Sequence, residues 1–191
     1  MASLRPVDDS EETINLLTEW RNKFWDSFAS KFEATKDRTR LWLRSQVMEN
    51  PNRILFLIRV DSQKIGHIGI FLYDELQKIV EIDNVLRGIR NGNHGLMEKV
   101  TKNIIQWVFD DLRFEKIRLR VFSDNYKAIN LYERCHMVTV DAIPLKRIFT
   151  NDGWKWEPAV VKENQYAERY HNVMEISRQS YSIYKNEFLD S

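Results

Sequence analysis

The sequence predicts one α/β (α+β) domain: a central, mixed and mostly antiparallel sheet of about seven strands, flanked by helices, with an extra helix at the C-terminus. A length of 191 residues is enough for one sizeable core. Short runs rich in β-branched and aromatic residues, bounded by turn residues, indicate the strands. Between them lie longer runs with apolar residues every three or four positions, which is typical of amphipathic helices.

The composition is that of an ordinary globular protein and argues against several classes of function. Apolar residues make up 43% of the chain and the formal net charge is +1, so no nucleic-acid partner held by bulk charge is expected. The single cysteine, Cys135, excludes an internal disulfide, and four scattered histidines predict no metal site. We see no signal peptide and no long apolar run, which predicts a cytoplasmic protein without a membrane partner.

The first quarter of the chain predicts a strand and two helices. A short strand at residues 3–7 precedes a helix that Ser10 caps and that carries acidic residues in its first turn. An aromatic-rich connection then leads to a second helix, which begins near Thr35 and ends before Pro51.

The rest of the domain predicts six further strands and two helices. Short turns separate three β-rich runs, which indicates an antiparallel meander, at residues 53–60, 64–74 and 78–86. A long amphipathic helix, a strand, a short helix and a hairpin follow, at residues 95–112, 116–123, 125–135 and 137–161. The hairpin is expected to turn at Asn151, Asp152 and Gly153.

Residues 161–191 are expected to form a helical extension of a domain that covers residues 1–160. From about Glu163 a polar segment carries aromatic and apolar residues at mixed spacings of three and four, as on one face of a helix. This helix is expected to pack on the domain or at a homodimer interface.

The junction between the strand at residues 78–86 and the long helix has the features of an anion site. The first backbone N–H groups and the positive dipole end of a helix attract negative charge. Gly92 and Gly95 permit a close backbone approach or a positive φ, and Arg87 and Arg90 add cations. A diphosphate is the expected ligand, although glycine-bearing turns also occur as ordinary loops.

A second motif follows this loop and the next strand: Asn125, Ala128 and Tyr132 form the pattern N-x-x-A-x-x-x-Y. The combination of loop, strand and motif resembles the GCN5-related N-acetyltransferase (GNAT) superfamily. The resemblance covers residues 3–159 in element order as well as in motif. It implies a GNAT fold, acetyl-CoA as the donor, CoA as the product and an amine as the acceptor. The residues that it implies for cofactor binding are Val85, Leu86, Arg87, Arg90, Asn91, Gly92, Asn93, His94, Gly95, Leu96, Asn125 and Ala128.

The resemblance also implies roles in the reaction. Asn125 would contact the pantetheine arm, a backbone N–H near Val85 would hold the oxyanion, and Tyr132 would protonate the departing thiolate. A phenol with an ordinary pKa of about 10 can share a proton with a thiolate whose thiol has a pKa of about 8.5. Taken alone, Asn125 also fits a helix cap and Tyr132 a core position. His136 stands where the family commonly has glycine, at a position that favours positive φ.

The acceptor amine needs a base or a water chain, because an aliphatic ammonium ion is not a nucleophile. Glu81 and Asp83 lie two residues apart in one predicted strand, so both point to the same face. Each is a candidate base, and each also fits a solvated strand face. His67 is a third candidate that also fits a structural role. Cys135 beside His136 lacks the geometry of a thiol nucleophile, because neighbouring helix residues point apart.

The acceptor is expected to be a small-molecule primary amine. The stretches LLTEWRNKFW, EIDNVLRG and RVFSDNYKAINLYERC resemble the superfamily branch that acetylates nucleotide-linked amino sugars for surface polysaccharides. The substrate-binding residues are then Arg21, which would pair with a phosphate, and Trp25 or Phe28, which would stack on a ring. Trp20 and Trp25 also fit core positions, with Arg21 in a surface ion pair.

Two other classes of function stay open at this point. The acceptor of a GNAT enzyme can be a protein N-terminus, a protein lysine or a polyamine, and a polyamine site would need several converging carboxylates, which do not cluster visibly in the sequence. Alternatively, the chain is a non-catalytic module that binds acyl-CoA. The presence of Asn125 and Tyr132 argues against that alternative.

Overall fold

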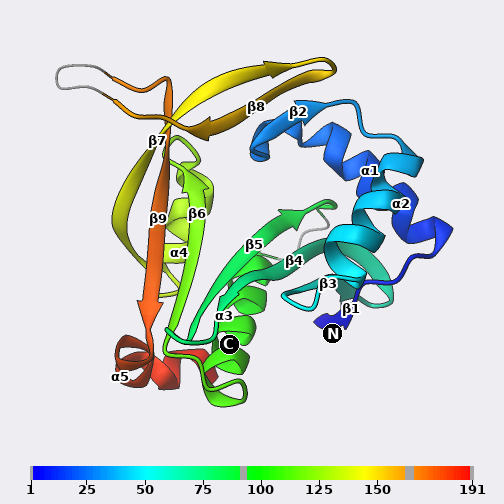
Figure 1. The fold of residues 1–191 in the computed structure, drawn as a ribbon. Helices are drawn as coiled ribbons and strands as arrows, with labels where there is room; N and C mark the ends of the chain where they lie inside the picture. Colours follow the sequence, from blue (N-terminus) through cyan, green and yellow to red (C-terminus); the bar gives the residue numbers. More distant parts are fainter. Residues whose placement is uncertain (1, 91–93, 162–165, 190–191) are drawn as a thin grey trace.

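Figure 1 presents the computed structural model, which describes residues 2–90, 94–161 and 166–189. The elements in chain order are β1 (Ala2–Pro6), α1 (Glu11–Lys23), the 3₁₀ turn η1 (Trp25–Ser27), β2 (Ser30–Phe32), α2 (Lys36–Trp42), the π-helical segment η2 (Leu43–Met48), β3 (Arg53–Val60), β4 (Gln63–Asp74), β5 (Ile79–Arg87), α3 (Leu96–Asp110), β6 (Lys116–Phe122), α4 (Tyr126–Glu133), β7 (Val138–Thr150), β8 (Gly153–Pro158), β9 (Arg169–Ser177) and α5 (Arg178–Leu189).

The sheet is mixed and mostly antiparallel, as the sequence predicts, but it has nine strands rather than about seven. Their order in the sheet is β1-β3-β4-β5-β6-β9-β7-β8-β2. Among the described strand pairs, β5–β6 alone is parallel. The two strands beyond the expected number are β2, a three-residue strand in the aromatic-rich connection, and β9.

Helices cover both faces of the sheet. Leu55 of β3 packs with α1 and η2 in one apolar cluster, whereas its neighbours Ile54 and Phe56 face the larger cluster built on α3, α4 and α5. Alternating strand residues point to opposite faces, so α1 and η2 lie on one side of β3 and α3 on the other. Within the described residues, no helix is long and apolar enough to cross a membrane.

The expectation of a helix from Glu163 onward is wrong for residues 169–177, which form β9 in the middle of the sheet. β9 pairs with β6 on one edge and with β7 on the other. Its central residues are buried, with Val173 at 5% and Met174 at 0% exposure. Two neighbouring strands offer hydrogen bonds to this segment, and that tertiary pairing outweighs the helix-like spacing of its side chains.

The helix at the C-terminus is α5, which is shorter than expected and packs on the domain. The ring of Tyr181 stacks on Phe109 of α3 with the ring centroids 4.9 Å apart. The Tyr181 hydroxyl donates a hydrogen bond to Asp110 (3.0 Å), and Lys185 forms an ion pair with the same carboxylate (3.0 Å). A role of α5 in a homodimer stays a prediction.

Strands β5 and β6 separate part-way along their length, and this divergence positions the site. Their parallel register runs from Ile79↔Lys116 to Ile82↔Leu119 and stops there, although both strands continue. At the same point the β4–β5 register shifts, and Asn84 has a φ of +48°. A bulge of this kind bends a strand, and β5 and β6 diverge toward their C-terminal ends (Figure 1).

Candidate active site

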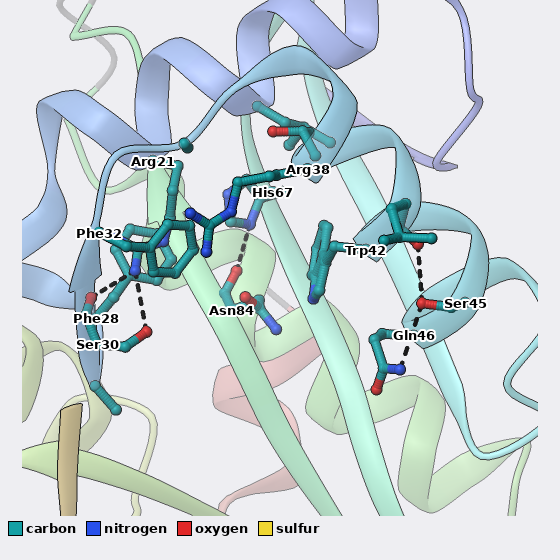
Figure 2. Close-up of a pocket in the computed structure, with 15 residues that line it drawn as sticks. Arg21, Phe28, Ser30, Phe32, Arg38, Trp42, Ser45, Gln46, His67 and Asn84 are labelled. Atoms are coloured by element: carbon teal, nitrogen blue, oxygen red, sulfur yellow. Dashed lines mark hydrogen bonds between the residues drawn. The ribbon is translucent and has the colours of Figure 1, made fainter. Parts of the chain in front are cut away.

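A pocket of about 470 Å³ lies between the N-terminal helices and the sheet. Its walls come from α1, the segment from Phe28 to β2, and α2 with η2, and its floor comes from His67 of β4 and Asn84 of β5 (Figure 2). A volume in this range suits a small molecule. The pocket therefore lies beside the point where β5 leaves β6.

Arg21 is the central cation of the pocket. It donates hydrogen bonds to the carbonyl and the hydroxyl of Ser30, and its guanidinium stacks on Phe28 (4.3 Å) and Phe32 (4.5 Å). Its Nη1 is buried and has no hydrogen-bond partner among the described residues. Burial and the neighbouring Arg38 lower the pKa of Arg21 to about 10, so the group is still charged at neutral pH.

Arg38 is a second cation in the lining and was not predicted from the sequence. Its guanidinium stacks on Phe32 at 4.3 Å and pairs with Asp152 at 2.6 Å. Figure 2 shows Arg21 and Arg38 on the Phe32 side of the pocket, with Trp42 beyond Arg38. The described lining residues include no Asp or Glu. This pocket consequently has the chemistry to bind an anion and a ring.

His67 has a structural environment. Its Nδ1 hydrogen-bonds with the carbonyl oxygen of Asn84 at 2.6 Å, and its ring lies against Trp20 at 6.0 Å. Burial lowers the pKa of His67 to about 4, so the imidazole is neutral at physiological pH. Trp20 is itself buried and covers Gly88, where an added Cβ would lie 2.1 Å from the indole ring. Trp20 is thus a core residue.

Asp83 lies where β5 and β6 separate, directly before the pocket residue Asn84. Its Oδ2 accepts hydrogen bonds from Arg53 (2.8 Å) and from the Asn84 amide (2.8 Å). Its Oδ1 is buried and has no hydrogen-bond partner within the described part of the chain. Burial raises the pKa of Asp83 to about 6, although Arg53 opposes that shift. A pKa in this range suits a group that accepts a proton near neutral pH.

Glu81 is paired with an arginine of the neighbouring strand. Arg120 of β6 donates two hydrogen bonds to Glu81 Oε1, from Nε at 2.9 Å and from an Nη at 2.7 Å. The Glu81 residue is 7% exposed. Both hydrogen bonds from Arg120 go to one oxygen of Glu81, whereas burial raises the pKa of Asp83 toward neutrality, so Asp83 is the stronger candidate for the base.

Tyr132 and Asn125 are placed by α4. Asn125 caps the helix, because its side chain accepts a hydrogen bond from the Ala128 N–H at 3.2 Å. Tyr132 is 6% exposed within the large apolar cluster, and burial raises its pKa well above the ordinary value. The phenol is therefore protonated at neutral pH. Their roles in the reaction stay predictions.

Cys135 and His136 have structural environments, in agreement with the rejection of a thiol nucleophile. Cys135 is fully buried, and that burial raises the pKa of its thiol to about 12. His136 has a φ of +59°, which confirms the expected positive value, and its ring stacks on Tyr184 of α5 at 4.0 Å.

The glycine-bearing loop before α3 is described in part. Gly95 is the N-cap of α3 with a φ of +74°, and a Cβ built there would meet no atom of the other described residues within 4 Å, its chain neighbours apart. Arg90 and His94 are exposed, and Arg87 Nε donates to the Ile89 carbonyl at 3.1 Å. The remaining predicted loop positions, Asn91, Gly92 and Asn93, lie outside the described residues.

Of the three predicted substrate-binding residues, Arg21 and Phe28 line the pocket and Trp25 does not. Trp25 instead packs edge-on against Trp154 of β8 at 6.2 Å. Arg38 could not be expected from the sequence, because nothing in the spacing of α2 relates it to Arg21. The sequence feature that pointed to Phe32 was the aromatic-rich connection between the first two helices.

These features fit acetyl-CoA. The diverging strands leave β5 without a β6 partner from Asp83 onward, which offers strand backbone to an extended arm. The open space around Gly95 at the start of α3 leaves room for a diphosphate beside the positive end of the helix. The fold and the site together define the class of acyl-CoA-dependent transferases.

The family is shown by sequence. The family model for the acetyltransferase (GNAT) domain matches residues 3–138. The chain therefore belongs to the GNAT family, whose members are acetyltransferases that use acetyl-CoA as donor. No curated protein sequence gives a significant match.

Solved structures share the fold at low sequence identity. The chain is similar to a spermidine N-acetyltransferase from Vibrio cholerae in complex with CoA and spermine, with a TM-score of 0.74 and 15% identity over 95% of this chain and 98% of that chain. It is also similar to a dodecameric structure of spermidine N-acetyltransferase from the same organism, with a TM-score of 0.68 and 17% identity over 94% and 95% of the two chains. Both of these neighbours are polyamine acetyltransferases.

Proposed function

We propose that the chain transfers the acetyl group of acetyl-CoA to the primary amine of a small molecule that also carries an anionic group, with a nucleotide-linked amino sugar as the leading candidate. The observation that carries this proposal is the pair of arginines on one wall of the pocket, where Arg21 and Arg38 both stack on Phe32. Guanidinium groups bind phosphate and carboxylate through parallel hydrogen bonds.

The balance of charge in the pocket supports an anionic acceptor over a polycation. Arg21 and Arg38 repel each other, and this repulsion contributes to the lowered pKa of Arg21. An anion between them would relieve the repulsion and would occupy the buried Nη1 of Arg21. A polyamine would add positive charge to a lining that contains no carboxylate among the described residues.

The chain supplies a base and an acid for the transfer. Acetyl-CoA provides the acetyl group as a thioester. Asp83, beside the pocket floor, takes a proton from the acceptor amine, directly or through a water molecule. A backbone N–H near Val85, in the part of β5 that has left β6, stabilises the oxyanion. Tyr132 gives its phenolic proton to the sulfur and so improves the leaving group.

A polyamine acceptor is the second candidate, because the solved neighbours named above are spermidine N-acetyltransferases. At 15–17% identity these structures establish a shared fold, and the acceptor pocket is the part in which enzymes of one fold differ most. The arginine pair is the feature that separates the two candidates.

The test is thiol release from acetyl-CoA with a panel of amines: nucleotide-linked amino sugars, the same amino sugars without the nucleotide, spermidine and short peptides. We expect a nucleotide-linked amino sugar to give the highest kcat/KM, and added salt to raise its KM because salt screens the arginines. Spermidine as the best acceptor would reject the proposal in favour of the second candidate. Product mass would identify the acetylated nitrogen.

A further inference from the structure

The wall of the pocket that carries Phe32 is held by a hairpin from the far end of the chain. Strand β2 pairs antiparallel with β8, with Ser30↔Lys155 and Phe32↔Gly153 in register. In Figure 1 the β7–β8 hairpin reaches across the molecule to β2 beside α1. This wall of the pocket is therefore β2, the edge strand of the sheet beside β8, and its position depends on that hairpin.

The tip of the hairpin fits tightly against β2. A Cβ at Gly153 would lie 1.8 Å from the carbonyl oxygen of Lys31, so only glycine permits this approach. At the other end of the contact, the backbone N–H of Trp156 donates a hydrogen bond to the carbonyl of Ala29 at 2.7 Å. This fit fixes the position of the neighbouring tip residue, Asp152, relative to the pocket.

Asp152 contacts the pocket through Arg38. Its Oδ2 accepts a hydrogen bond from Arg38 Nη1 at 2.6 Å, across 114 positions of sequence. The Thr150 hydroxyl donates to Asp152 Oδ1 at 3.2 Å, which orients the carboxylate. The Arg38 guanidinium is thus held between Asp152 and the ring of Phe32.

Arg38 needs such a partner to stay near Arg21. Both guanidinium groups lie over Phe32, and the charge of Arg38 contributes to the lowered pKa of Arg21, because like charges repel. Nearly half of the Arg38 side chain is exposed (45%), so without a partner it is free to turn into water, where its charge is best solvated.

We infer that Asp152 is a positioning residue for the acceptor: it keeps Arg38 beside Arg21, so that the two guanidinium groups bind one anionic group together. This inference rests on the proposed function and adds to it a residue of the hairpin that does not line the pocket. Asp152 determines specificity because its effect is confined to acceptors that carry the anion.

The test is Asp152→Asn, with steady-state kinetics at saturating acetyl-CoA for a nucleotide-linked amino sugar and for the same amino sugar without the nucleotide. We expect the KM of the nucleotide-linked acceptor to rise about fivefold or more, the usual effect of losing one charge-assisted hydrogen bond. The KM of the free sugar and of acetyl-CoA should change by less than about twofold. Equal changes for both acceptors, or no change for either, would overturn the inference.

Two further variants separate positioning from general damage. Glu157→Gln breaks the Lys155–Glu157 pair (2.5 Å) on the same hairpin at similar exposure, and it should leave every constant unchanged. In an Arg38→Gln background, Asp152→Asn should have no further effect on the acceptor KM, because the two residues act as one unit. Additive effects would contradict the inference even if one single variant folded poorly.

The outcomes also distinguish this inference from the proposed function. A wild-type enzyme that prefers the nucleotide-linked acceptor, together with an Asp152→Asn variant that retains that preference in full, would reject the positioning role alone. A wild-type enzyme that shows no preference for the anionic acceptor would reject both.

Discussion

Asp83 owes its basicity to its position and not to its residue type. An ordinary aspartate is a weak base at neutral pH, but here burial raises the pKa to about 6. Gly69 of β4 makes room for the carboxylate, since a Cβ there would lie 2.5 Å from Asp83 Oδ1. Arg53 holds the other oxygen at 2.8 Å and keeps the pKa from rising further. The proton affinity of Asp83 thus depends on residues that are distant from it in the sequence.

A prediction about pH follows from this environment. Asp83 accepts a proton only as the carboxylate, so kcat/KM should fall about tenfold per pH unit as the pH drops below about 6. Asp83→Asn should lower kcat by about a hundredfold and remove that limb of the profile. Glu81→Gln is the matched control on the same strand and should cost less than about tenfold, because Glu81 is paired with Arg120 and is not the proposed base. An Asp83→Asn enzyme with the wild-type profile would exclude Asp83 as the base.

Tyr132 is tested by removal of one oxygen. Tyr132→Phe should lower kcat by about thirtyfold or more, because the leaving thiolate loses its proton donor, while acetyl-CoA affinity measured by calorimetry stays within about twofold. Phenylalanine retains the buried packing of the ring, so the fold should survive. Tyr126 is 70% exposed on the same helix, and Tyr126→Phe should behave as wild type. An unchanged kcat in Tyr132→Phe would remove Tyr132 from the mechanism.

At the scale of elements, the bulge in β5 and the start of α3 shape the donor site. The β4–β5 register shift and the positive φ of Asn84 coincide with the end of β5–β6 pairing at Ile82↔Leu119. The bend separates two strands that lie side by side until that point. One irregular residue, Asn84, therefore lies where the strands separate and also lines the pocket that we propose for the acceptor.

Gly95 tests the role of the α3 entrance. Its φ of +74° is costly for a β-branched residue, so Gly95→Val should weaken acetyl-CoA binding about tenfold or more in calorimetry by shifting the loop and adding bulk. Gly95→Asn is the control, because asparagine tolerates this conformation, and it should lose less affinity than valine. The added Cβ meets no other described part of the chain within 4 Å, its sequence neighbours apart. Unaltered affinity in the valine variant would count against this entrance as the diphosphate site.

At the scale of the whole molecule, the end of the chain completes the sheet. β9 lies between β6 and β7, and α5 covers α3, so the last segment closes the larger core. Met174, Ile176, Tyr181 and Phe188 from these two elements are each at most 2% exposed. Residues 161–191 are therefore not a helix added to a complete sheet.

A truncated chain tests this organisation. A protein of residues 1–160 lacks β9 and α5, so β6 and β7 each lose one of their two partner strands and the apolar cluster is exposed. We expect no cooperative thermal unfolding by circular dichroism, because the loss of several buried side chains exceeds the usual margin of stability. A chain that ends at residue 189 is the control and should unfold as the full chain does. A cooperative transition in the shorter protein would establish 1–160 as an independent domain.

The sequence by itself determined the features that depend on neighbouring residues. The caps at Ser10, Thr35 and Asn125 and the hairpin turn before Gly153 follow from the hydrogen bonds and backbone preferences of a few adjacent positions. The family also follows from local motifs, because the loop before α3 and the spacing within α4 lie in continuous segments.

Only the tertiary structure decided the position of β9, the strand β2 and the contents of the acceptor pocket. Residues 169–177 have a helix-like spacing but form a strand, because they pair with β6 and β7. Strand β2 forms because β8 lies beside it. The contact between Arg38 and Asp152 and the burial of Asp83 likewise join segments far apart in the chain. Such pairings cannot be recognised from the local periodicity of the sequence. The interactions that stabilise them are made with residues far away in the chain.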